Sequence, residues 1–106
     1  MSPEERGSQF LKAVADELPF GGRAIFDNYA GPVYLELTDL EAEVPGNKWG
    51  TRAMEVITRL ADFYAVNLVA IPRGEPGDDL YERLAAFYGR FGFAGEDALH
   101  RPCAGS

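Results

Sequence analysis

The chain has 106 residues, of which 46% are hydrophobic and 25% charged, a composition typical of one compact globular domain. Its formal net charge of −7 argues against nucleic acid and anionic lipid surfaces as partners, because both repel an acidic protein. A chain of this size buries enough surface to fold without metals or disulfides.

The single cysteine, Cys103, lies in a terminal segment of Arg, Pro, Ala, Gly and Ser, so no disulfide can form within the chain. An unpaired cysteine suits a reducing compartment. The sequence has no apolar run near the ~18 residues that a membrane-spanning helix needs. Its polar, acidic N-terminus is unlike a signal peptide. We therefore expect a cytoplasmic protein with no membrane partner.

The first predicted element is an N-terminal helix. Ser2, Pro3 and Glu5 supply a cap, a proline at the first helical position and a carboxylate that completes the capping pattern. Apolar residues then recur at helical spacing until Pro19. This apolar stripe consists of Phe10, Leu11, Val14 and Leu18.

Two strands are expected next, over residues 23–29 and 33–44, and the second carries a change of phase. The alternating apolar sets are Val33, Leu35 and Leu37, then Leu40, Ala42 and Val44. The phase changes at Thr38 and Asp39 without a turn, which predicts one extra residue there, a β-bulge. Such a bulge frees backbone N–H and C=O groups from the strand ladder.

A second helix is predicted from about Gly50 to Tyr64. Its expected inward residues are Ala53, Val56, Ile57, Leu60, Ala61 and Tyr64. Ala65 stands where glycine often ends such a helix, which predicts either a mildly strained last turn or one closed through Asn67. The continuous apolar run 68–71 then predicts a central strand covered on both faces.

The last part of the chain is predicted to form a helix and a strand. Asp79 and Glu82 indicate the capped start of the helix. Its apolar residues are Leu80, Tyr81, Leu84, Phe87 and Tyr88. The strand is expected from Phe91 to about His100. This order of elements predicts a single α/β domain over residues 1–106.

The loop before the second helix, residues 45–51, has the sequence PGNKWGT. Several of its N–H groups can point together at an anion, while the helix dipole adds about half a positive charge. Lys48 and Arg52 lie at the same end, and an anion between them would offset their unfavourable interaction with the dipole. The alternative is a glycine-containing loop whose basic residues are merely solvated. The loop lacks the motifs of nucleotide P-loops and dinucleotide folds.

The segments VPGNKWGTRAMEVITRLADFYAVNLVAIP, residues 44–72, and ERLAAFYGRFGF, residues 82–93, follow a recognisable order: glycine loop, amphipathic helix, buried strand, helix with tyrosine, Gly-Phe. This order resembles the C-terminal half of the GNAT superfamily of acyl-coenzyme A-dependent N-acetyltransferases. The resemblance covers about residues 33–102. It implies a mixed, splayed sheet with helices on both faces and acetyl-CoA as cosubstrate. The acceptor would be a small amine or a protein lysine.

The resemblance also implies which residues bind acetyl-CoA: the bulged strand contributes its backbone, and the loop contacts the pyrophosphate. These residues are Leu40, Ala42, Gly46, Asn47, Lys48, Trp49, Gly50, Thr51 and Arg52. The family loop usually has Arg or Gln, two residues, Gly, one residue, then Gly or Ala. Here Pro45 takes the first position, Lys48 replaces the first glycine, and only Gly50 matches.

Tyr88 takes the position of the family's catalytic acid, four residues before Gly92. A phenol, with an ordinary pKa of about 10, suits protonation of a coenzyme thiolate of similar basicity. The alternative is a core tyrosine that keeps its hydroxyl at the helix edge. The family often has Asn two turns earlier, where this chain has Tyr81.

Glu36 is the preferred candidate base for the incoming ammonium group, because it lies in the opposite phase from Leu35 and Leu37. Asp39 and Glu41 are alternatives near the predicted bulge, and all three can instead belong to the solvent face of the strand. His100 has no carboxylate close in sequence, so we expect it at the surface or on an edge strand.

The alternative function is a non-catalytic GNAT-fold module that binds a protein partner. The altered loop at Pro45 and Lys48, together with Tyr81, supports it.

Overall fold

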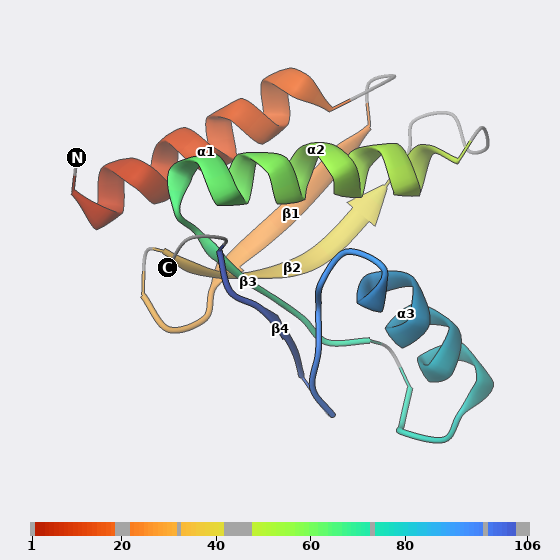
Figure 1. Cartoon of the computed structure of the whole chain (residues 1–106). Coiled ribbons are helices and arrows are strands. Elements are labelled where there is room, and N and C mark those ends of the chain that lie inside the picture. The colour runs from red at the N-terminus through yellow and green to blue at the C-terminus, as the bar shows by residue number, and fades with distance from the viewer. Residues whose placement is uncertain are drawn as a thin grey trace.

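The computed structural model describes residues 2–18, 22–31, 33–41, 48–72, 74–96 and 98–103. Within these ranges the elements are α1 (Pro3–Glu17), β1 (Arg23–Asn28), β2 (Tyr34–Glu41), α2 (Trp49–Tyr64), β3 (Asn67–Ala70), α3 (Asp79–Gly89) and β4 (Leu99–Arg101). The strands form one mixed open sheet in the order β1-β2-β3-β4, in which only β2 and β3 are parallel (Figure 1). The predicted α/β class is therefore confirmed.

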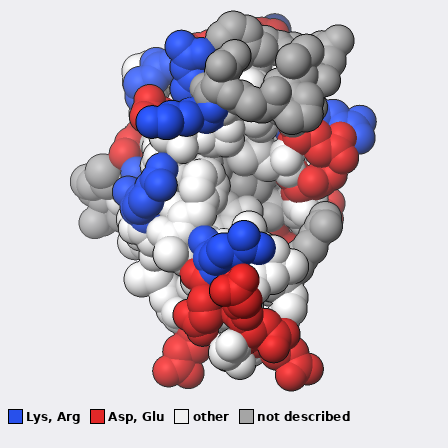
Figure 2. Space-filling model, turned by 90° about the vertical axis from the view of Figure 1, so that its right-hand side faces the viewer, with Lys and Arg blue, Asp and Glu red and all other residues white. Residues whose placement is uncertain are grey.

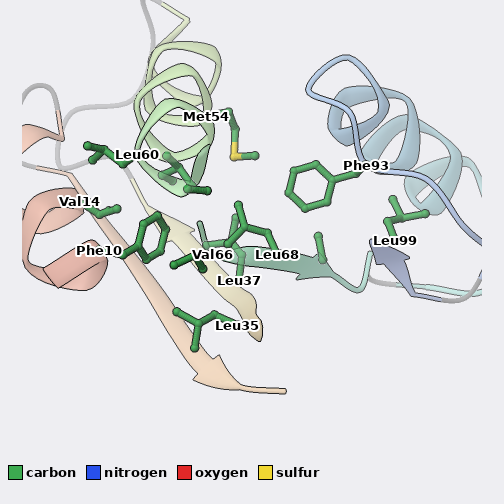
Figure 3. Packing of buried hydrophobic residues seen from close by; sticks show 13 residues of the cluster. Phe10, Val14, Leu35, Leu37, Met54, Leu60, Val66, Leu68, Phe93 and Leu99 are labelled. Carbon is green, nitrogen blue, oxygen red and sulfur yellow. The ribbon is translucent and has the colours of Figure 1, made fainter. Parts of the chain in front are cut away.

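The helices α1 and α2 lie side by side on one face of the sheet (Figure 1). Beneath them is a core that draws on both helices, on the strands β2, β3 and β4, and on the segment after α3 (Figure 3). The fully or nearly buried members of this core are Phe10, Val14, Leu35, Leu37, Met54, Ile57, Leu60, Ala61, Val66, Leu68, Ala70, Phe93 and Leu99. Of the predicted inward residues of α2, Ile57, Leu60 and Ala61 belong to this core. Ala53 is also buried, and Val56 and Tyr64 pack half-buried against the core.

Helices were expected on both faces of the sheet, and the observed arrangement differs. The third helix, α3, packs against the same core through Ala85, Phe87 and Tyr88. On the opposite face of the sheet Tyr34, Glu36 and His100 remain half-exposed.

The predicted β-bulge in β2 is confirmed at Thr38. Ile25 of β1 pairs with Asp39, but the next residue, Phe26, pairs with Leu37, so Thr38 is the extra residue. Its hydroxyl donates a hydrogen bond to the Ile25 carbonyl at 3.1 Å. The bulge shifts the alternation by one residue, which is the physical cause of the phase change in the sequence.

The central strands β2 and β3 stop pairing just at this bulge. Their parallel register begins at Tyr34–Asn67 and ends at Leu37–Ala70. β2 continues to Glu41 beside β1, whereas β3 ends at Ala70. Within the described residues the two strands therefore have no ladder hydrogen bonds with each other beyond Leu37.

The start of α1 is as predicted, because the Ser2 hydroxyl accepts a hydrogen bond from the Glu5 N–H at 3.2 Å. In the apolar stripe Phe10 and Val14 are buried. The prediction for Leu11 was wrong, since its side chain is 40% exposed.

The start of α3 was predicted one residue too late. Asp78 is the capping residue, and Asp79 is the first residue of the helix. The Asp78 carboxylate accepts a hydrogen bond from the Glu75 N–H at 3.1 Å, and Glu82 accepts one from the Gly77 N–H at 3.1 Å. The acidic residues thus fix the loop before the helix.

The last strand is much shorter than predicted. Phe91 and Gly92 form a turn, in which the Phe91 N–H donates to the Tyr88 carbonyl at 2.9 Å and Gly92 has a φ of +94°. Only Leu99–Arg101 forms β4, with an isolated bridge between Ala94 and His100. Phe91 and Phe93 both favour a strand, but the turn forms because it lets Phe93 enter the core.

Ala65 ends α2 in the left-handed conformation, with a φ of 57°. Of the two predicted alternatives for the end of α2, the structure therefore shows the strained last turn. Asn67 does not close the helix, because its side-chain oxygen accepts a hydrogen bond from the Cys103 N–H at 3.0 Å.

We expect the substitution Ala65→Gly to stabilise the protein by about 1 kcal/mol, because glycine has no Cβ to clash in this conformation. The measurement is thermal unfolding, where the midpoint should rise by roughly 4 °C. Ala13→Gly, inside α1, is the matched control and should lower it, since a helix interior disfavours glycine. A lower midpoint for the Ala65 variant would contradict the assigned strain.

Candidate functional site

A pocket of about 310 Å³ opens where β2 and β3 stop pairing, with α3 as its third wall. The lining residues are Leu37, Thr38, Asp39, Leu40, Ile71, Pro72, Leu80, Leu84 and Tyr88. The structure thus brings together the bulged strand and the tyrosine that the sequence analysis singled out separately. Leu40, a predicted cofactor residue, lies in the same wall.

Tyr88 reaches the pocket because one face of α3 lines it. Leu80, Leu84 and Tyr88 follow one another at intervals of one helical turn, so their side chains lie in one row. The Tyr88 ring packs against Phe87 and Phe93 at centroid distances of 5.5 and 5.4 Å. These aromatic contacts fix the ring and leave the residue half-buried.

Tyr81 has a structural role. Its side chain is buried and does not line the pocket. Its hydroxyl donates a hydrogen bond to the backbone carbonyl of Glu96, which ties α3 to the segment before β4.

Of the three candidate carboxylates, the structure brings Asp39 alone to the pocket wall. Glu36 lies between Asp27 and Val69 in the sheet, on the face away from α1 and α2. Glu41 is exposed and forms an ion pair with Arg23 at 2.8 Å. The carboxylate of Asp39 accepts a hydrogen bond from the Leu40 N–H at 2.9 Å.

His100 lies on β4, an edge strand of the described sheet, as expected. Its Nδ1 shares a hydrogen bond with the Tyr34 hydroxyl. Its ring also packs edge-on against Tyr29 and Tyr34. These contacts place His100 on the open face of the sheet and outside the pocket lining.

At the start of α2, Lys48 is the capping residue and has a left-handed conformation, with a φ of 56° and no side-chain capping hydrogen bond. Trp49 is buried, and a Cβ added to Gly22 would overlap its ring, so its side chain anchors the helix rather than facing a ligand. The predicted cofactor residues Ala42, Gly46 and Asn47 lie outside the described residues.

Three cations gather at this end of α2. Lys48 and Arg52 line a shallow hollow together with Thr51 and Glu55. Arg90, at the end of α3, donates a hydrogen bond to the Thr51 hydroxyl at 3.1 Å and lies over the Phe87 ring at 5.5 Å. With the first N–H groups of the helix, this cluster forms a candidate site for an anion.

Figure 2 shows the charge of this side of the molecule. Lys and Arg occur mainly in its upper half, where α2 begins, and Asp and Glu are densest at the lower end, where α3 begins. Arg90 was missed from the sequence because its place beside Thr51 depends on how α3 packs. The sequence FYGRF, residues 87–91, places Arg90 among aromatic residues, and this pattern could have indicated a cation–π contact of Arg90.

The pocket and the cation cluster are neighbours through the last turn of α3. Tyr88 lines the pocket, and Arg90, two residues later, reaches Thr51 of α2. Gly50 lies beside Phe87. A Cβ added to Gly50 would lie 3.6 Å from the Cζ atom of the Phe87 ring. The last turn of α3 therefore has the pocket on one side and the cation cluster on the other.

Comparison of the chain with protein-family models, curated proteins and solved structures gave no match. No helix in the described part of the chain is long and apolar enough to cross a membrane. The same residues contain no group of three or more His, Cys, Asp or Glu side chains that could hold a metal ion. The functional conclusion therefore depends on the pocket and the cation cluster.

We expect Lys48→Glu to weaken the binding of inorganic pyrophosphate roughly fivefold, a loss of about 1 kcal/mol for a charge at an exposed site. Calorimetric titration at low ionic strength is the measurement, and added salt should reduce the difference. Lys12→Glu, an equal charge change on the exposed side of α1, is the control. Equal affinities of the two variants would exclude an anion site at the start of α2.

Proposed function

We propose that this chain is a small GNAT-like N-acetyltransferase that moves an acetyl group from acetyl-CoA to an amine. The main support is the pocket that joins the bulge at Thr38 to Tyr88, directly beside the cations of α2. The two features come from separate parts of the sequence, and acetyl transfer requires them in one place. The parting of β2 and β3 at the bulge fits the splayed central strands that the GNAT resemblance implies.

Acetyl-CoA is proposed to bind with its diphosphate at the start of α2, among Lys48, Arg52 and Arg90. Backbone N–H groups and cations at a helix start suit a diphosphate group. The pantetheine arm would pass Leu40 and the bulge, where the backbone is released from pairing with β3. The thioester would then lie in the pocket next to Tyr88.

The reaction forms a C–N bond and breaks a C–S bond. The ammonium group of the acceptor first loses a proton to water at the open mouth of the pocket, and the neutral amine attacks the thioester carbonyl. As the thiolate leaves, it takes a proton from the Tyr88 hydroxyl. The tyrosine regains this proton from the nitrogen that has become an amide. The products are the N-acetyl amine and coenzyme A.

The carboxylate that assists the amine is proposed to be Asp39 in place of Glu36. Asp39 shares the pocket wall with Tyr88, whereas Glu36 lies on the half-exposed face beside Asp27 and Val69. A carboxylate that holds the ammonium group while it loses its proton to water must lie within hydrogen-bond reach of that group.

We expect acetyl-CoA to stabilise the protein against thermal unfolding. A dissociation constant of about 100 μM corresponds to roughly 1.4 kcal/mol of stabilisation at 1 mM ligand. Acetyl-pantetheine, which lacks the nucleotide and the diphosphate, is the control and should bind much more weakly. The absence of any shift would favour the non-catalytic module that binds a protein partner, with which the structural role of Tyr81 agrees.

We expect Tyr88→Phe to lower kcat about 100-fold or more, because the thiolate then leaves without its proton donor. The dissociation constant of acetyl-CoA should stay unchanged, since the ring and its packing remain. The measurement is release of coenzyme A under saturating acetyl-CoA. Tyr29→Phe, on the open face of the sheet, is the matched control. Unchanged turnover in the Tyr88 variant would assign Tyr88 to core packing alone.

A further inference from the structure

We infer that the acceptor is a small primary amine with an apolar body, whose ammonium group binds Asp39. This inference rests on the proposed acetyl transfer and names the acceptor class of the same site. Four features support it: the composition of the pocket wall, the position of Asp39, the position of the acidic residues at the start of α3, and the volume of the pocket.

The pocket wall is mainly apolar. Its apolar residues are Leu37, Leu40, Ile71, Pro72, Leu80 and Leu84. Two of them, Ile71 and Leu80, are 49% and 45% exposed, so large apolar side chains meet solvent at one pocket. An apolar surface that gathers at a cavity indicates a ligand that covers it. An alkyl or aromatic group on the acceptor would do so.

Among the described residues that line this pocket, Asp39 is the one that carries a charge. It follows the bulge residue Thr38, and its carboxylate is oriented by the hydrogen bond from the Leu40 N–H at 2.9 Å. An ionised carboxylate has lone pairs for further donors, so the same group can accept an ammonium N–H. An acceptor with one ammonium group and an otherwise apolar structure therefore matches this pocket wall.

The described acidic residues at the start of α3 lie outside the pocket lining and have partners of their own. Asp79 forms an ion pair with Arg83 at 3.4 Å. Asp78 and Glu82 accept hydrogen bonds from backbone N–H groups of their own loop. A diamine or polyamine would place its second charge against Ile71 and Leu80, where none of the described residues that line the pocket is acidic.

The volume of the pocket also limits the acceptor. About 310 Å³ is near the lower end of the range for small-molecule sites, and part of it must hold the thioester. An amine of one alkyl chain or one aromatic ring fits this space.

The test is a kinetic series with acetyl-CoA and the linear amines from propylamine to hexylamine, beside phenethylamine, 1,4-diaminobutane and a lysine peptide. We expect kcat/KM to rise roughly two- to fourfold for each methylene that is added, as apolar transfer predicts. Hexylamine and phenethylamine should exceed 1,4-diaminobutane and the peptide by at least about tenfold. Binding of the same amines without acetyl-CoA, measured by thermal shift, should follow the same order.

Two variants locate the acceptor. Asp39→Asn should raise KM for hexylamine about tenfold while the dissociation constant of acetyl-CoA stays unchanged, and Asp27→Asn, exposed on the neighbouring strand, is its control. Leu80→Gln should flatten the dependence on chain length, and Leu11→Gln, equally exposed on α1, should not.

The outcomes separate the two proposals. Acetyl transfer that prefers the diamine or the peptide, or that shows no dependence on chain length, overturns the acceptor class and leaves the transferase intact. An Asp39→Asn variant with unchanged KM does the same. A protein that binds neither acetyl-CoA nor the amines overturns both proposals.

Discussion

The site depends on where the parallel pairing of β2 and β3 ends. The ladder stops at Leu37–Ala70, and the next residue of β2 is the bulge residue Thr38. Because side chains alternate along a strand, one extra residue exchanges the two faces for everything that follows. Leu40 therefore packs against the core, and Asp39 is kept out of it. Without the bulge the carboxylate would face the apolar core and the leucine would face solvent, so both the fold and the pocket wall require Thr38.

The third wall of the pocket is held in place by contacts that follow α3. The guanidinium group of Arg101 donates to both carboxylate oxygens of Asp62 on α2, at 2.9 and 3.0 Å, and to the Phe91 carbonyl at 2.7 Å. Bidentate pairs between arginine and a carboxylate fix the relative orientation of the two groups as well as stabilising the fold. The Arg101 side chain in this pair is only 14% exposed. Phe93 adds apolar burial beside Met54 (Figure 3). The turn after α3 is thus fastened to α2, and this sets the distance between Tyr88 and the cations of that helix.

Local signals in the sequence predicted most of the fold. The cap of α1, the helical period of α2, the apolar run of β3 and the phase change at Thr38 each depend on neighbouring residues. The structure confirms them, except that β3 covers Asn67–Ala70 and leaves Ile71 outside the strand and 49% exposed. The turn at Phe91 could not be predicted, because it is decided by the burial of Phe93 and by Arg101 from another strand. The alternation of side chains along a strand predicts which face of the sheet a residue occupies. It does not predict where two neighbouring strands stop pairing. Sequence reasoning therefore preferred Glu36, while the structure brings Asp39 to the pocket.

The two ends of α2 show why backbone strain must be interpreted together with its surroundings. Lys48 and Ala65 both have left-handed conformations that glycine would adopt more easily. At Ala65 the turn lets Val66 enter the core, so packing offsets the strain. Lys48 is exposed, and its side chain makes no capping hydrogen bond. A glycine there would relax the backbone but remove a positive charge beside the helix start, next to Arg52 and the Arg90–Thr51 pair. Strain at an exposed cation of this kind agrees with the proposed anion site, because an anion beside Lys48 would interact favourably with the lysine and with the positive end of the helix dipole.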